Sequence, residues 1–128
     1  MSKSRSGLFT GTTGAKVTAQ GLSDHREKFL GKTVGQINKI LQKRGYKTTI
    51  RKSKFSSSRA KVIVVGNTSK ERNITQVQVS AGSKRHGDVP YVKISTSDIG
   101  IHKIIDAKES EYKTDGHEKA TLLFRRYF

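Results

Sequence analysis

A histidine, a lysine and several hydroxyl-bearing residues stand within one short stretch of this sequence, at His86, Tyr91, Lys93, Ser95 and Thr96. Together these side-chain types can cut RNA without a metal ion. A neutral imidazole, with an ordinary pKa of about 6.5, can take the proton from a 2′-hydroxyl so that its oxygen attacks the neighbouring phosphate. A fixed ammonium group then stabilises the charge on the phosphate oxygens, and a hydroxyl can position the phosphate or assist proton transfer. Such a reaction leaves a 2′,3′-cyclic phosphate.

Further residues could complete such a site. A second imidazole would act as general acid, and His102 is the candidate, because the strand pattern around it allows it to share a face with Lys93. Other basic side chains are candidates for phosphate contacts, namely Lys84, Arg85, Arg59 and Arg72. Each residue also has an ordinary interpretation, since loop histidines, edge tyrosines packed on a helix and solvated basic faces are common in proteins.

A metal-dependent nuclease is the alternative chemistry. Two-metal sites need clustered carboxylates, and the central strand-like stretches are nearly free of them. Glu111 and Lys113 form an E-x-K pattern like that of restriction-type nucleases, with Asp98 or Asp106 upstream. This pattern arises easily by chance in a lysine-rich chain. The chain has no cysteine, which excludes zinc sites built on thiolates, and we expect no metal and no other cofactor.

The alternation of apolar and polar residues predicts that several of the candidate groups share one face of a strand. Val92 and Ile94 should point into the core, and the pleat then puts Tyr91, Lys93 and Ser95 together on the opposite face. The chain's only proline stands directly before this strand and fixes the direction of the preceding loop, which carries His86.

Helix signals are confined to the first third of the chain. Two capping-box patterns, in which Asp or Thr is followed three residues later by Glu or Gln, predict helix starts at Asp24 with Glu27 and at Thr33 with Gln36. The first helix should end at Gly31. The second should span residues 34–44, with apolar residues on one face, and end at Gly45.

From residue 46 onward the apolar period changes to two, which predicts short strands near residues 46–51, 62–65, 75–79, 91–96, 101–105 and 122–128. The predicted class is α+β, with one or more N-terminal helices on one face of a curved antiparallel sheet of about four to six strands. The other face would be open to a ligand. We interpret residues 1–20 as a flexible or loosely packed leader and residues 21–128 as a single domain.

The charge balance indicates a polyanionic partner. The 128 residues include 26 Lys and Arg against 10 Asp and Glu, for a formal net charge of +16. Such an excess destabilises a compact chain through self-repulsion, and nucleic acid is the commonest partner that offsets this repulsion.

No stretch approaches the ~20 apolar residues of a membrane span. The basic residues are also interleaved with strand patterns, which disfavours a membrane-active amphipathic helix.

Three segments resemble the C-terminal toxin domains of bacterial polymorphic toxins of the LXG type. They are residues 7–12, residues 21–33 and, above all, residues 85–100, with the sequence RHGDVPYVKISTSDIG. The resemblance implies the ribonuclease fold shared by barnase, EndoU, colicin D and RelE. His86, Lys93 and Ser95 or Thr96 match the side-chain types that such enzymes use.

The same resemblance implies a biological setting. The ribonuclease would be secreted as part of a larger bacterial toxin and would act in the cytoplasm of a rival cell, often against tRNA. A cognate immunity protein would block it, and we expect that inhibitor to be acidic and to cover Tyr91 and Lys93. The resemblance also implies a delivery domain outside this sequence, so we expect the chain to be an excised C-terminal fragment.

Three functions therefore stay open. The first is a metal-independent ribonuclease, the second is a toxin that cuts DNA with a metal, and the third is a non-catalytic module that binds RNA or DNA. Cleavage of RNA under chelation separates the first from the others. The oligomeric state does not follow from the sequence.

Overall fold

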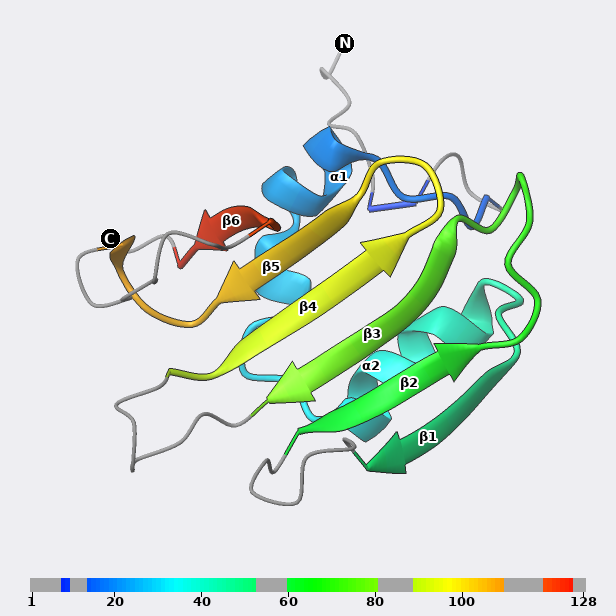
Figure 1. The fold of residues 1–128 in the computed structure, drawn as a ribbon, viewed down its shortest axis with the longest axis horizontal. Coiled ribbons are helices and arrows are strands. Elements are labelled where there is room, and N and C mark those ends of the chain that lie inside the picture. The colour runs from blue at the N-terminus through cyan, green and yellow to red at the C-terminus, as the bar shows by residue number, and fades with distance from the viewer. Residues whose placement is uncertain (1–7, 10–13, 53–59, 81–88, 110–118, 126–128) are drawn as a thin grey trace, which may run out of the picture.

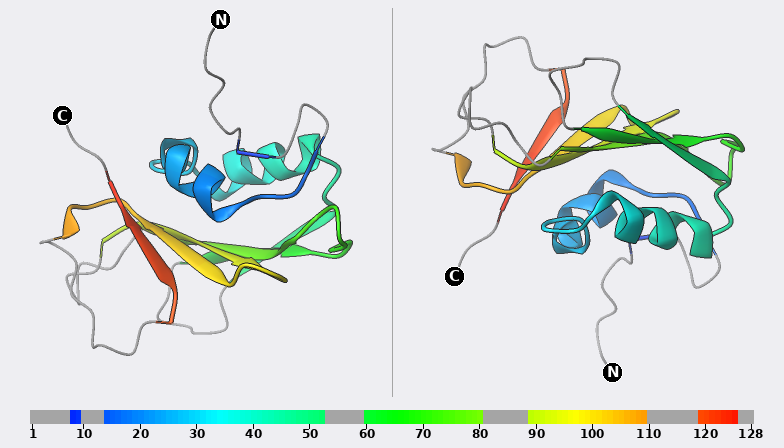
Figure 2. Two further views of the ribbon diagram at one scale, coloured as in Figure 1. Left: turned by 90° about the horizontal axis from the view of Figure 1, so that it is seen from above. Right: turned by 90° about the horizontal axis from the view of Figure 1, so that it is seen from below.

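A computed structural model describes residues 8–9, 14–52, 60–80, 89–109 and 119–125. The chain forms two layers, with the helices together on one side of a six-stranded sheet (Figures 1 and 2). The helical elements are α1 (Ala19–Asp24), the 3-10 turn η1 (Arg26–Lys28) and α2 (Val34–Lys43). The strands are β1 (Thr48–Lys52), β2 (Lys61–Val65), β3 (Ile74–Ser80), β4 (Tyr91–Thr96), β5 (Ile101–Ile105) and β6 (Thr121–Phe124). The predicted α+β class is confirmed.

Helix α2 begins at the predicted residue and ends one residue before the predicted end. The Thr33 hydroxyl accepts a hydrogen bond from the Gln36 backbone N–H at 3.1 Å, and the Gln36 side chain accepts one from the Thr33 N–H at 2.8 Å. This reciprocal capping box satisfies two of the N–H groups that a helix start leaves unpaired. Ile37 and Leu41 are fully buried against the sheet, and Gly45, with φ of 86°, follows the helix in a left-handed conformation.

The first helix starts earlier than predicted. The hydroxyl of Thr18 accepts a hydrogen bond from the Gly21 N–H at 3.0 Å and caps α1, so that Asp24 ends this helix instead of opening one. The predicted capping box of Asp24 and Glu27 is therefore wrong. The Gly- and Thr-rich composition concealed a short helix that packing stabilises, because Leu22 is fully buried.

The sheet has the strand order β1-β2-β3-β4-β5-β6, so that every strand lies next to its neighbours in sequence. All pairs are antiparallel except β5 and β6, which are parallel. The prediction of a wholly antiparallel sheet is wrong at this edge. A parallel pair needs a long connection that returns the chain to the starting end of the sheet, and residues 106–120 between the two strands provide that length.

The core lies between the helices and the inner face of the sheet. Its fully buried members are Leu22, Phe29, Ile37 and Leu41 from the helical layer and Ile63, Ile74, Val77, Ile94 and Ile104 from the strands. At roughly 1.5–3 kcal/mol for each buried apolar side chain, this cluster is the main source of stability.

Among the described residues, no helix has the length and apolarity needed to cross a membrane.

The described part of residues 1–20 belongs to the packed domain instead of forming a loose leader. Phe9 and Val17 are buried core residues and form an antiparallel bridge. The buried Asn73 side chain accepts a hydrogen bond from the Val17 N–H and donates one to the Val17 carbonyl, each at 2.8 Å. Asn73 thus attaches this segment to the end of the sheet.

Candidate nucleic-acid interface

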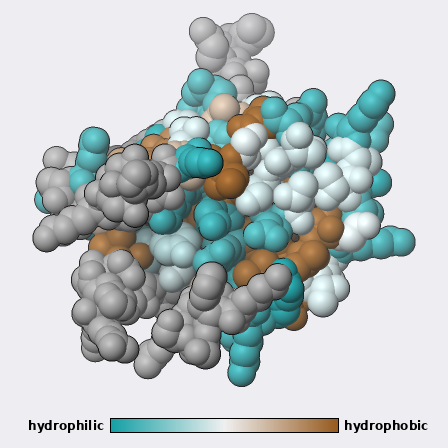
Figure 3. Space-filling model, viewed as in Figure 1, coloured by the Kyte–Doolittle hydropathy of each residue, from teal (hydrophilic) through white to brown (hydrophobic). Residues whose placement is uncertain are grey.

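The alternation predicted for residues 91–96 is confirmed in β4. Val92 and Ile94 are buried, whereas Tyr91, Lys93 and Ser95 are partly exposed. Because successive residues of a strand point to opposite faces, these three side chains lie on the face of the sheet away from the helices. We call this surface the open face and define it by Gln76, Gln78, Tyr91, Lys93, Ser95 and Lys103. Figure 3 shows hydrophilic side chains gathered over the middle of this side of the molecule.

Two lysines lie opposite each other in the centre of the open face. The register of β4 and β5 pairs Lys93 with Lys103, and that of β3 and β4 pairs Lys93 with Gln78. Directly opposed residues of an antiparallel pair have Cβ atoms about 4.5–5.5 Å apart, and like charges at that distance destabilise the sheet. Within the described part of the chain, none of the six strands contains Asp or Glu. A bound anion between the two ammonium groups would offset their repulsion.

Tyr91 connects this lysine pair to the neighbouring strand. The Lys103 Nζ atom lies 4.3 Å from the centre of the Tyr91 ring, which is a cation–π contact. The Gln78 Nε2 atom donates a hydrogen bond of 3.0 Å to the Tyr91 hydroxyl. A phenol that accepts in this way can still donate its own proton. The hydroxyl therefore has a fixed position and can donate to a ligand on the open face.

The two hydroxyl residues that follow have different placements. Ser95 lies on the open face, paired with Gln76 on one side and Ile101 on the other. Thr96 is the last residue of β4, and its hydroxyl bonds the connection to β5, donating to the Gly100 carbonyl at 2.7 Å and accepting from the Ile99 N–H at 3.0 Å. The structure therefore brings Ser95, but not the Thr96 hydroxyl, to the group around Lys93.

His102 is on the wrong face of the sheet for the predicted role. Its register partner is Ile94, so it points with the core residues toward the helical layer, and it is only 3% exposed. Its Nδ1 atom is buried and has no hydrogen-bond partner among the described residues. Burial lowers the pKa of this imidazole below its usual value, because desolvation disfavours the charged form. The prediction that His102 shares a face with Lys93 is wrong.

Arg72, the remaining candidate among the described residues, is not joined to this cluster. Arg72 lies in the turn before β3, where its Nε donates to the Asn67 carbonyl at 3.2 Å, close to Gly45 at the end of α2. It therefore holds a turn at one end of the sheet. His86, Lys84, Arg85 and Arg59 lie outside the described residues, and their roles stay predictions.

Two of the carboxylates considered for a metal site, Asp98 and Asp106, are far apart. Asp98 precedes β5 and Asp106 follows it, so the length of the strand separates them. The Asn73 amide and then Lys16 hold the pKa of Asp98 below its usual range, whereas Asp106 pairs with Arg125 at 3.2 Å. Glu111 and Lys113 lie outside the described residues. Within the described ranges, no group of three or more His, Asp or Glu could hold a metal ion.

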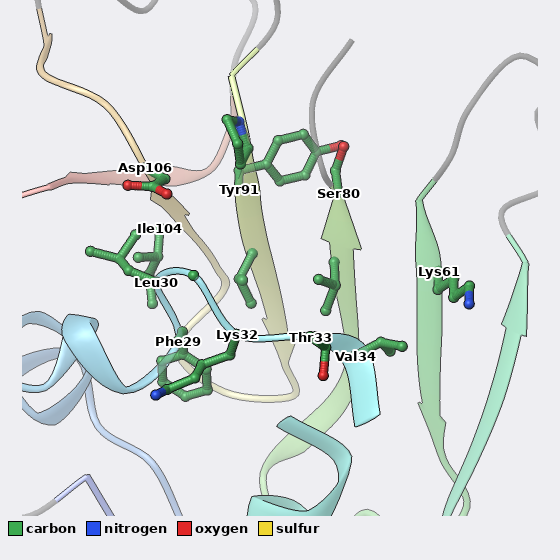
Figure 4. A pocket seen from close by; sticks show the side chains of 14 residues that line it. Phe29, Leu30, Lys32, Thr33, Val34, Lys61, Ser80, Tyr91, Ile104 and Asp106 are labelled. Atoms are coloured by element: carbon green, nitrogen blue, oxygen red, sulfur yellow. The ribbon is translucent and has the colours of Figure 1, made fainter. Parts of the chain in front are cut away.

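A pocket of about 410 Å³ adjoins Tyr91 at one end of the sheet. Its walls are the loop from Phe29 to Val34, the facing ends of β2, β3 and β4, and Asp106 (Figure 4). Tyr91 and Ser80, which are register partners, lie side by side on its rim. Sequence reasoning did not identify this pocket, because its walls come from segments far apart in the chain.

Lys103 and Gln78 were also missed. Successive residues of a strand point to opposite faces, so the sequence already indicated that Lys103 and His102 lie on opposite faces of the strand at residues 101–105. The pairing of Lys103 with Lys93 depends on the register between β4 and β5, which the alternation within each strand does not specify.

No protein-family model matches the chain, and neither a curated protein nor a solved structure matches it.

Proposed function

We propose that this protein binds single-stranded RNA on the open face and cleaves it there without a metal ion. The observation that carries the proposal is the opposed pair of Lys93 and Lys103 beside the hydrogen-bonded Tyr91 hydroxyl. The net charge of +16 supports a polyanionic ligand, since phosphate contacts release counterions and dominate the affinity for nucleic acids.

The arrangement of the open face favours RNA in single-stranded form. It combines cations, a partly exposed tyrosine ring, and amide and hydroxyl groups on adjacent strands. Single-stranded nucleic acids bind to such surfaces through backbone contacts to cations and through stacking of bases on aromatic rings. In our proposal, one phosphate lies between the ammonium groups of Lys93 and Lys103, and the Tyr91 hydroxyl donates to one of its oxygens.

The proposed reaction is an internal transfer. The 2′-oxygen of a ribose forms a bond to the adjacent phosphorus as the bond from phosphorus to the 5′-oxygen of the next nucleotide breaks. The products are a 2′,3′-cyclic phosphate and a 5′-hydroxyl. A base takes the 2′-hydroxyl proton, an acid returns one to the 5′-oxygen, and the lysine pair stabilises the additional charge on the phosphate oxygens. His86 is the base in this proposal.

A matched set of variants tests this proposal. The intact protein is incubated with tRNA, total RNA and duplex DNA in excess EDTA, and the RNA termini are analysed. We expect cleavage of RNA to 2′,3′-cyclic phosphate ends and no cleavage of DNA. The doubly substituted Lys93→Gln/Lys103→Gln protein should lose both binding and cleavage. Lys39→Gln/Lys43→Gln, which removes two exposed cations from α2, is the matched control and should retain both.

The substitution His86→Ala separates binding from cleavage. We expect it to abolish cleavage while RNA affinity and folding are retained, because a general base contributes about 10²–10⁴ to the rate and little to affinity. Binding of RNA by the unmodified protein without any cleavage would instead identify a non-catalytic RNA-binding module. Cleavage of DNA that disappears in EDTA would identify a metal-dependent nuclease.

The same surface suggests how an inhibitor would act. An acidic immunity protein that covers Tyr91 and Lys93 would neutralise the lysine pair and exclude RNA by occupying its site. A complex that leaves this part of β4 exposed would contradict a site-blocking mechanism.

A further inference from the structure

We propose that the pocket beside Tyr91 holds a nucleobase of the bound RNA, a role that rests on the proposed function and extends it to base recognition. The pocket has a volume of about 410 Å³, within the range of about 300–1,000 Å³ that is usual for small-ligand sites. It is lined by Phe29, Leu30, Val34, Val79, Val92 and Ile104, with polar groups around them.

The apolar part of this lining suits the flat faces of a base. Val79, Val92 and Ile104 come from adjacent strands, and Phe29 and Leu30 come from the loop before α2. Bases that leave the stack bind in proteins between apolar and aromatic side chains and form hydrogen bonds through their edges. Thr33 also lines the pocket, and its hydroxyl can supply such a bond.

The charges around the pocket favour a phosphate-bearing ligand. Lys32 and Lys61 are exposed and lie on different sides of the pocket (Figure 4). The only acidic residue among the described lining residues is Asp106, whose carboxylate is paired with Arg125 at 3.2 Å. The electrostatic balance of the lining is thus positive, as it must be for a ligand with a phosphate group.

Tyr91 stands at the end of β4, where the pocket and the open face meet the same strand end. It lines the pocket, and its ring and hydroxyl also contact Lys103 and Gln78. Val79, Val92 and Ile104 line the pocket from the inner face of the sheet, so an RNA strand with a phosphate at the lysine pair would pass around the end of β4, beside Tyr91, to place a base in the pocket. Recognition of that base would select a nucleotide near the cleaved bond.

Nuclear magnetic resonance of the methyl groups of Ile, Leu and Val tests this directly. The intact protein is titrated with each of the common nucleoside 5′-monophosphates and, separately, with ribose 5-phosphate. We expect the signals of Leu30, Val34, Val79 and Ile104 to shift with at least one nucleotide and not with ribose 5-phosphate. The exposed Ile50 on β1 should not respond. Equal shifts with both ligands, or no pocket shifts at all, would overturn the inference.

A pocket-filling substitution provides the second arm. Val34→Phe should weaken nucleotide binding by about tenfold, within the range that stacking of one base contributes, whereas Ile50→Phe should leave it unchanged. If Val34→Phe does not fold, Lys32→Gln/Lys61→Gln is compared with Lys28→Gln/Lys39→Gln, and only the former should lose nucleotide affinity. Equal affinities in these two proteins would count against the pocket.

The two proposals can fail separately. If nucleotides shift the pocket methyl groups but RNA is not cleaved in EDTA, the base site stands and the ribonuclease proposal fails. If RNA is cleaved and the Lys93→Gln/Lys103→Gln protein is inactive, yet the pocket signals do not respond, the ribonuclease proposal stands and the base site fails.

Discussion

Lys93 and Lys103 are directly opposed in the antiparallel pairing of β4 and β5, on the face of the sheet away from the helices. Two like charges in this position lower the stability of the unliganded sheet. The cation–π contact of Lys103 with the Tyr91 ring compensates for part of that cost. Such a pair of ammonium groups is the arrangement that our proposal assigns to a bound phosphate.

Neutralising the lysine pair should change stability and RNA affinity in opposite directions. We expect Lys93→Gln/Lys103→Gln to raise the free energy of unfolding by roughly 0.2–1 kcal/mol, because the cross-strand repulsion is removed. The slope of log affinity against log salt for single-stranded RNA should become shallower by about 0.7 for each phosphate that the variant no longer neutralises. Urea denaturation and salt titrations measure the two quantities. A loss of stability together with unchanged RNA affinity would contradict our interpretation of the pair.

The Tyr91 hydroxyl should matter for cleavage more than for binding. Tyr91→Phe keeps the ring, and with it the contact to Lys103, but removes the group that Gln78 holds in place. If the hydroxyl donates to the phosphate as charge develops, we expect kcat to fall by about a hundredfold, as for the loss of one such donor in other enzymes. Single-turnover cleavage and RNA binding are measured side by side. An unchanged rate would remove Tyr91 from the proposed chemistry.

The buried His102 should make the protein less stable in mildly acidic solution. Burial lowers its folded-state pKa below the value of about 6.5 in the unfolded chain. As pH falls through about 6.5, the unfolded state binds a proton that the folded state does not, so the free energy of unfolding decreases until the folded pKa is reached. His102→Leu should remove this part of the pH dependence, as measured by urea denaturation between about pH 7.5 and pH 5.

The same variant tests the placement of this imidazole. Since His102 points toward the helical layer, the folded His102→Leu protein should cleave RNA at the rate of the unmodified protein. A large loss of cleavage with intact folding would show that the imidazole reaches the substrate after all.

Asn73 should be among the most sensitive polar residues for stability. Its side chain bonds both backbone groups of Val17 and donates to Asp98 at 2.8 Å, and it is 1% exposed. Asn73→Ala leaves buried backbone groups unpaired, at about 1–3 kcal/mol for each. We expect a loss of about 3 kcal/mol in the free energy of unfolding. Asn67→Ala is the control at a more exposed asparagine, and equal losses in the two variants would contradict the special role of Asn73.

The elements that could be predicted are those with a local signal. The capping box of Thr33 and Gln36 satisfies helix N–H groups within a few residues, so α2 was predicted close to its observed bounds. The alternation of Val92 and Ile94 with Lys93 likewise assigned each side chain of β4 to its face. Helix α1 was missed at its start because burial of Leu22, not local composition, stabilises it.

By itself, the sequence determined the α+β class, the strong positive charge and the side chains that share a face within one strand, because a strand's period of two is a local property. Only the tertiary structure decided that Lys103 stands opposite Lys93, that His102 faces the core, that β6 runs parallel to β5, and that distant segments form a pocket beside Tyr91. Those relationships depend on strand register and on which face the helices cover. Both are set by contacts between residues far apart in the chain, which no local pattern encodes.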